Sequence, residues 1–209
     1  MKKIRYSEIT PEKVYLNRRS FIKSIGLSAG SAALTSIPFI NHARSNEENK
    51  VTSYKDITTY NNYYEFGTSK SDPYINSQQF KTTPWTISIE GEVEKPIKLS
   101  MDEITETFIS EERIYRLRCV EGWSMVIPWM GFSLSELLSK VNPTSKAKFI
   151  EFESVYDPEQ MKGQRYPVLN WPYKEGLRID EAMHPLTTVV TGLYGKKLPN
   201  QNGAPFRIF

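Results

Sequence analysis

The sequence predicts an α+β domain in which short helices and mixed sheets are joined by long loops. Apolar and polar residues alternate in several segments, which is the period of a half-buried strand, and helix-start signals stand between these segments. Prolines interrupt the connecting stretches at positions 128, 158, 167, 172, 185, 199 and 205. Because proline is tolerated poorly in helix interiors and central strands, this spacing favours a mixed fold with functional loops.

The first elements of the domain follow one another closely. Trp85, Ile87 and Ile89 alternate with polar residues, which predicts a strand. Ser100 and Glu103 then have the spacing of a capping box, in which each residue accepts a hydrogen bond from the other's backbone, so a short helix is expected from this point.

The next strand is predicted over residues 114–120. Successive side chains of a strand point to opposite faces, so Tyr115, Leu117 and Cys119 share one face. A second capping signal stands at residues 133–136, and further strands are predicted over residues 149–155 and 186–190. A last strand is expected to open at Phe206, after the Asn202-Gly203 turn.

The first 43 residues are predicted to be a twin-arginine export signal. Arg18 and Arg19 are followed by Ser-Phe-Ile-Lys, a weakly apolar stretch rich in Gly, Ala and Ser, and small residues near Ala43. This stretch is shorter than the roughly 20 apolar residues that span a bilayer. We therefore expect a periplasmic protein with a flexible polar linker over residues 44–59 and one domain over residues 60–209.

Composition excludes several classes of protein. Hydrophobic residues make up 39% and charged residues 24%, which is typical of a globular protein. A net charge of +3 is too small to indicate nucleic-acid binding. The single cysteine, Cys119, excludes an internal disulfide, and two histidines make an all-protein zinc site hard to assemble. Cys119 is thus a buried apolar residue, a reactive thiol or a metal ligand whose partners come mostly from outside the protein.

Two features favour a ligand site. Arg113, Arg116 and Arg118 are expected to approach the Cys119 thiol from one side, where positive charge stabilises a thiolate. Residues 198–207 gather amide and guanidinium donors around a glycine, which suits an anionic ligand such as a phosphate, although a solvated turn fits equally well. Pro128, Trp129 and the Trp123-Ser124-Met125 segment predict an enclosed, aromatic-lined cleft.

Four stretches of the chain resemble one known family. They are NNYYEFG (61–67), RLRCVEGWSM (116–125), EGLRIDEAMHPL (175–186) and QNGAP (201–205). Together they resemble the periplasmic protein-methionine-sulfoxide reductase catalytic subunits, which have the sulfite-oxidase-like molybdenum fold. The similarity runs from about residue 60 to the end. Because family members continue further, the domain is expected to be incomplete at its C-terminus.

The resemblance implies a molybdenum-molybdopterin cofactor. One pterin dithiolene, oxygen ligands and the thiolate of Cys119 would hold the metal, and Gly122 stands where alanine is usual. Ser154 stands where threonine is expected and keeps its hydroxyl. The remaining residues that match cofactor-contacting positions are Asn61, Tyr64, Glu65, Asn202 and Arg207.

The activity implied is the reduction of methionine sulfoxide in oxidised periplasmic proteins by oxygen-atom transfer. Electrons would come from a membrane haem-binding subunit that draws on quinol. Two alternatives stay open at this point. One is a sulfite-oxidising enzyme of the same fold, and the other is a non-catalytic exported binding module in which Cys119 is merely buried.

Overall fold

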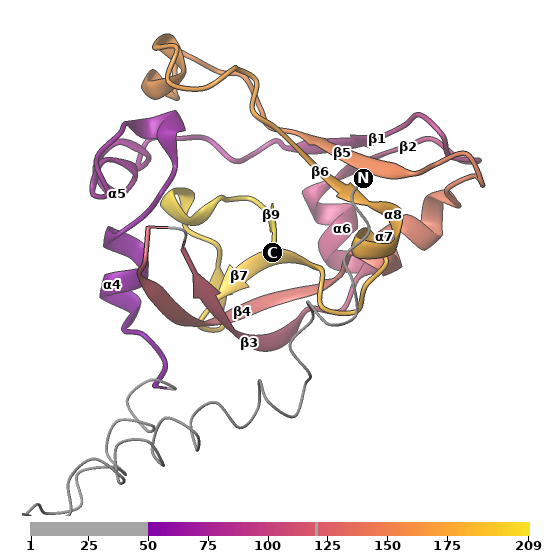
Figure 1. The fold of residues 1–209 in the computed structure, drawn as a ribbon, viewed down its shortest axis with the longest axis horizontal. Coiled ribbons are helices and arrows are strands. Elements are labelled where there is room, and N and C mark those ends of the chain that lie inside the picture. The colour runs from indigo at the N-terminus through magenta and orange to yellow at the C-terminus, as the bar shows by residue number, and fades with distance from the viewer. Residues whose placement is uncertain (1–49, 120) are drawn as a thin grey trace, which may run out of the picture. The chain divides into compact units, whose positions relative to one another are not determined.

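The computed structural model describes residues 50–119 and 121–209, so the predicted export signal lies outside the described residues. The described part is an α+β domain with antiparallel sheets joined by short helices and loops (Figure 1). Its helices are α4 (Tyr54–Thr59), η2 (Tyr64–Phe66), α5 (Asp72–Asn76), α6 (Met101–Thr107), α7 (Leu134–Val141), η3 (Lys162–Arg165), α8 (Ile179–Ala182) and η4 (Asn200–Asn202). Its strands are β1 (Thr86–Ile89), β2 (Ile97–Ser100), β3 (Glu111–Arg118), β4 (Ser124–Ser133), β5 (Phe149–Glu153), β6 (Lys174–Arg178), β7 (Thr188–Leu193), β8 (Lys196–Lys197) and β9 (Arg207–Ile208).

The central sheet has the order β3-β4-β7-β8, and β9 also pairs with β7. β3 and β4 form a long hairpin whose register ends at Arg118 opposite Ser124. Cys119 therefore lies in the turn of this hairpin, at one end of the sheet. Arg207 pairs with Val190 of β7, which places the start of β9 beside the middle of the sheet.

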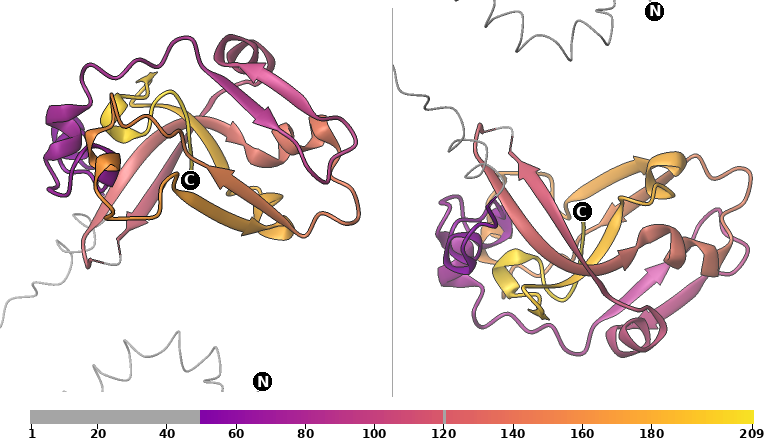
Figure 2. Two further views of the ribbon diagram at one scale, coloured as in Figure 1. Left: turned by 90° about the horizontal axis from the view of Figure 1, so that it is seen from above. Right: turned by 90° about the horizontal axis from the view of Figure 1, so that it is seen from below.

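Two smaller ribbons, β1-β2 and β5-β6, lie at the end of the domain opposite α4 and α5 (Figure 2). Apolar side chains from both ribbons, the central sheet and α6 to α8 form one core cluster. A second cluster lies where α4 meets the central sheet and contains Ile57, Met125, Ile127, Trp129, Val190, Leu193 and Leu198. The second cluster supports the segments that carry the predicted site residues.

Both predicted capping boxes are confirmed. The backbone N–H of Ser100 donates to Glu103 at 2.7 Å, and that of Ser133 donates to Glu136 at 3.3 Å. These caps start α6 and α7. No helix in the described residues is long and apolar enough to cross a membrane.

The predicted strands are also found, with shifted ends. β3 begins three residues before the predicted 114–120 segment and ends at Arg118. β7 starts at Thr188 and not at residue 186, because Pro185 and Leu186 lie in a turn that His184 stabilises. In that turn the N–H of Leu186 donates to Nδ1 of His184 at 3.2 Å, and the N–H of Thr187 donates to the His184 carbonyl at 3.0 Å.

The linker predicted over residues 44–59 is wrong for its last six residues, which form α4. Ser53 caps this helix by accepting the N–H of Asp56 at 3.1 Å. Ile57 is only 1% exposed and belongs to the second core cluster. The segment looks polar in sequence because a helix of six residues buries few side chains. Its order comes from tertiary packing. The described residues all belong to one compact unit.

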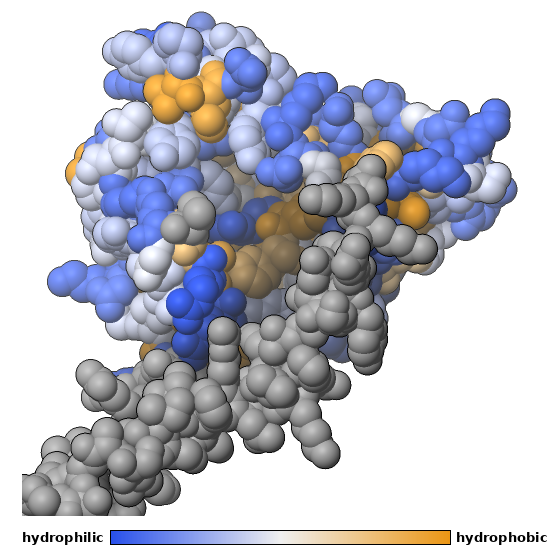
Figure 3. Space-filling model, in the orientation of Figure 1, coloured by the Kyte–Doolittle hydropathy of each residue, from blue (hydrophilic) through white to orange (hydrophobic). Residues whose placement is uncertain are grey.

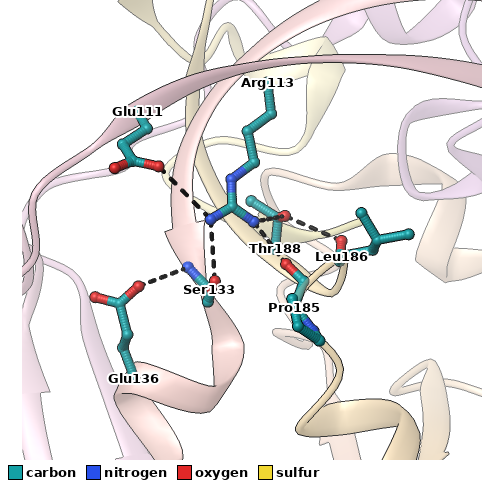
Figure 4. Close-up of polar contacts among 7 residues, drawn as sticks. All are labelled: Glu111, Arg113, Ser133, Glu136, Pro185, Leu186 and Thr188. Atoms are coloured by element: carbon teal, nitrogen blue, oxygen red, sulfur yellow. Dashed lines mark hydrogen bonds and ion pairs between the residues drawn. The ribbon is translucent and has the colours of Figure 1, made fainter.

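Arg113 ties the middle of the domain together (Figure 4). Its guanidinium donates to the Pro185 carbonyl at 2.8 Å, to Thr188 Oγ1 at 3.2 Å and to Ser133 Oγ at 3.0 Å. The flanking Glu111 carboxylate lies 3.8 Å away. One side chain of β3 thus fixes the β4-α7 junction against the turn that precedes β7.

Candidate functional site

One face of the domain is hollowed at its centre, over the region where β9 lies in the same view (Figures 1 and 3). The loop at residues 60–70 contacts three distant parts of the chain, which are Glu121 after the end of β3, Gly163 of η3 and Asn202 of η4.

The segment 60–70 is held at both ends by its own backbone. The N–H of Asn61 donates to the Lys70 carbonyl at 2.9 Å, which closes the segment into a loop around η2. Phe66 anchors η2 because it packs edge-on against Phe80, in a cluster that includes Met161. Asn61, Tyr64 and Glu65 therefore stand on a fixed loop.

Asn61 and Asn202 are brought together by one carbonyl group. The side-chain amide of Asn61 donates to Ile57 O at 3.0 Å, and that of Asn202 donates to the same oxygen at 3.1 Å. Gly203 follows with φ +99°, and a Cβ there would come within 2.5 Å of the Tyr63 hydroxyl. This close approach lets η4 dock on the first loop.

Arg207 lies between two aromatic rings. Its guanidinium carbon is 5.4 Å from the centre of the Tyr63 ring and 5.2 Å from that of the Trp129 ring, which is cation–π contact. Nη1 of Arg207 and the Tyr63 hydroxyl each donate to the Asn202 carbonyl at 3.3 Å. Burial raises the pKa of Tyr63, while the charge of Arg207 acts in the opposite direction.

The loop at residues 154–173 closes against the first loop. η3 packs so tightly on η2 that a Cβ on Gly163 would overlap the carbonyl oxygen of Tyr64. Ser154 Oγ accepts the N–H of Tyr173 at 3.1 Å, so its hydroxyl holds the two ends of this loop together. Burial raises the pKa of Glu65, which favours the neutral carboxyl group.

Cys119 is a free, half-buried thiol in the β3-β4 turn. Its N–H donates to the Trp123 carbonyl at 2.9 Å, and its carbonyl accepts the N–H of Gly122 at 3.1 Å. Gly122 has φ +89°, a conformation that strains any residue with a Cβ, so glycine suits this turn. The thiol lies 3.9 Å from the carboxylate of Glu121.

The sequence predicted that three arginines approach the thiol from one side, and the structure does not place them together. Arg116 and Arg118 lie on the exposed face of β3, opposite the half-buried Tyr115 and Leu117, because side chains alternate along a strand. Arg113 shares the face of Tyr115 and Leu117 but lies six residues before Cys119 and contacts Pro185, Thr188 and Ser133. The cation near the thiol is Lys70, which pairs with Glu121 at 2.8 Å.

Comparison with known proteins identifies the family. Residues 74–209 match the family described as oxidoreductase molybdopterin binding domain. Over 97% of its length the chain is 52% identical to the "Protein-methionine-sulfoxide reductase catalytic subunit MsrP" of Xanthomonas axonopodis pv. citri and 48% identical to that of Burkholderia mallei. The chain belongs to this family of molybdopterin oxidoreductases. It spans 67% and 66% of the length of these two relatives.

A solved structure supports the fold of this molybdopterin oxidoreductase. The sulfane dehydrogenase SoxCD from Paracoccus pantotrophus superposes with a TM-score of 0.52 at 13% identity, over 98% of this chain and 53% of that one. Identity this low shows the fold alone. The predicted α+β, sulfite-oxidase-like molybdopterin-binding fold is confirmed.

The residues at the hollow fit a molybdopterin. Among the described residues, buried atoms without a hydrogen-bond partner include Asn61 Oδ1, Asn202 Oδ1, Arg207 Nε and Trp129 Nε1. Buried polar atoms are nearly always paired, so these atoms indicate a ligand that both donates and accepts hydrogen bonds. A pterin ring does both, and its phosphate accepts charge-assisted bonds from a guanidinium. A thiolate at Cys119 is the type of ligand that soft metals prefer.

The structure brings Asn61, Asn202 and Arg207 into one cluster, with Glu65 on the same loop as Asn61. Tyr64 stands on the same loop, where its carbonyl oxygen packs against Gly163 of η3, and Ser154 closes the loop that carries η3. Their roles toward the cofactor remain predictions. Sequence reasoning missed Tyr63, which stacks on Arg207, and Lys70, whose partner is 51 residues away. Tyr63 stands inside the matching NNYYEFG stretch, whereas Lys70 carries no signal of its own.

Proposed function

We propose that this chain is the catalytic subunit of a molybdoenzyme that reduces methionine sulfoxide residues in proteins to methionine. The supporting observation is the identity of about one half, over 97% of the chain, to relatives that carry this name. Each turnover consumes two electrons and two protons, and converts the sulfoxide into a thioether and water.

The residues of this chain would hold the reaction centre in place. When bound, the molybdenum cofactor supplies the two-electron oxygen-atom-transfer chemistry. Cys119 would ligate its metal, Asn61 and Asn202 would accept hydrogen bonds from its pterin, and Arg207 would donate to its phosphate. Because the rings of Tyr63 and Trp129 fix the guanidinium of Arg207, little side-chain freedom is left to lose on binding.

The substrate is tested with the metal-loaded, full-length protein and a reduced dye as electron donor. We expect steady turnover of free methionine sulfoxide and of oxidised protein, and negligible oxidation of sulfite. Quinol-reduced membranes that contain a haem-binding partner subunit are expected to replace the dye. Efficient sulfite turnover with inert sulfoxide would reverse the assignment to a sulfite-oxidising enzyme, and a protein without molybdenum would indicate a binding module.

Export to the periplasm by the twin-arginine route is also part of the proposal. It is supported by Arg18 and Arg19 and the weakly apolar stretch that follows them. Replacing both arginines with lysine should keep the protein in the cytoplasm, which fractionation with compartment markers measures. The unchanged chain should be found in the periplasmic fraction, and its retention in the cytoplasm would contradict the export signal.

A further inference from the structure

Glu121 connects the thiol turn to the first loop. Its Oε1 accepts a hydrogen bond from Lys70 Nζ at 2.8 Å, and its Oε2 accepts one from Trp123 Nε1 at 2.9 Å. The same Oε2 lies 3.9 Å from the Cys119 sulfur. The carboxylate therefore accepts hydrogen bonds from the Lys70 ammonium, from the Trp123 indole and, while the thiol is protonated, from Cys119.

Lys70 holds the other side of this connection. Its Nζ also donates to Asn62 Oδ1, and its carbonyl accepts the N–H of Asn61 at 2.9 Å. One residue thus contacts the backbone of Asn61, the side chain of Asn62 and the carboxylate of Glu121. Tyr60 packs edge-on against Trp123 with ring centres 5.3 Å apart, which adds an apolar contact between the same two segments.

The negative charges of a Cys119 thiolate and of Glu121 require a cation close to them. Cys119 as a metal ligand is a thiolate, and a carboxylate beside it repels the negative charge. Two like charges about 4 Å apart repel each other, and the repulsion grows where the surroundings exclude water. Lys70 forms the one salt bridge to Glu121 in the described residues and offsets this repulsion. Arg116 and Arg118 lie on the exposed face of β3.

We propose that Lys70 is a positioning residue, which places the Cys119 turn against the first cofactor-binding loop and balances the charge of Glu121. It acts through Glu121 and Asn62. The proposal rests on the proposed function only in taking Cys119 as a ligand of the molybdenum cofactor.

The test compares Lys70→Met, Lys70→Arg and the exchanged pair Lys70→Glu with Glu121→Lys, each in the full-length protein. Molybdenum content and the Mo(V) paramagnetic spectrum are measured before any activity. We expect Lys70→Met to lower the molybdenum content about fivefold, equivalent to about 1 kcal/mol in binding, and to alter the Mo(V) spectrum. Lys70→Arg should stay near the wild type, and the exchanged pair should recover part of the loss.

Arg178→Met is the matched control. It removes an exposed cation from a 2.7 Å salt bridge with Asp180, at the end of β6 far from the Cys119 turn (Figure 1). It should change neither the metal content nor the spectrum. If Lys70→Met folds poorly, the exchanged pair decides: recovery supports the positioning role, and no recovery contradicts it.

Wild-type metal content, spectrum, kcat and KM in Lys70→Met would overturn the proposal. Failure of the proposed function is a separate result. A wild-type protein that holds molybdenum but does not reduce methionine sulfoxide would contradict the assigned substrate, while the metal content and spectrum of the Lys70 variants would still decide the role of Lys70.

Discussion

Cys119→Ser is expected to abolish the Mo(V) paramagnetic signal and to lower sulfoxide reduction by more than about a hundredfold. Loss of the outer partners of a metal ligand alone typically costs about 10- to 100-fold, and a hydroxyl is a far weaker ligand for a soft metal than a thiolate. Metal analysis, the paramagnetic spectrum and steady-state turnover measure the effect.

The Cys119 variant is informative because the substitution is small. The turn is held by backbone hydrogen bonds between Cys119, Gly122 and Trp123, and serine keeps all of them. The metal-free forms of wild type and variant should therefore unfold at nearly the same temperature. Activity and metal content like those of the wild type would remove Cys119 from the site.

Arg207→Met is expected to weaken cofactor retention by about 10- to 100-fold. A hydrogen bond to a charged group contributes about 1.5–3 kcal/mol, and each 1.4 kcal/mol corresponds to about a factor of ten. Methionine fills much of the space between Tyr63 and Trp129 but donates no hydrogen bond. Molybdenum content after extended dialysis, compared with that of the wild type, measures the loss.

Arg207→Lys distinguishes the effect of the positive charge at this position from that of the planar guanidinium group. Lysine keeps the positive charge but lacks the planar fork that stacks on the Tyr63 and Trp129 rings, so we expect an intermediate loss. Arg178→Met serves as the control for removal of an arginine elsewhere. If Arg207→Met retained the cofactor as firmly as the wild type, Arg207 would be a structural residue of β9.

Local sequence signals predicted much of the fold. The capping boxes at Ser100 and Ser133 involve residues three apart, and the face shared by Tyr115 and Leu117 follows from the period of a strand, which ends one residue before Cys119. The same period also corrects one prediction. Arg116 and Arg118 lie close to Cys119 in sequence, but the alternation of side chains along β3 places them on the exposed face of the strand.

Contacts between distant residues could not be predicted from local signals. α4 is too short to form alone, and its order depends on Ile57 packing in a core that residues far along the chain complete. The Lys70–Glu121 pair joins two loops, and the stack of Tyr63, Arg207 and Trp129 joins three segments. Only the family resemblance located Asn61, Asn202 and Arg207 together.

The two hydrogen bonds to the carbonyl oxygen of Ile57 bear on the stage of chain synthesis at which a cofactor can bind. This oxygen orients the amides of Asn61 and Asn202, two residues 141 positions apart in sequence, so that each amide uses its N–H₂ group internally. The Asn61 bond joins residues four positions apart, whereas the Asn202 bond forms only after η4 has been synthesised and has docked on α4. A nascent chain that ends before residue 202 therefore lacks one of the two amides, and the complete pair is available to a cofactor only after this segment has been synthesised.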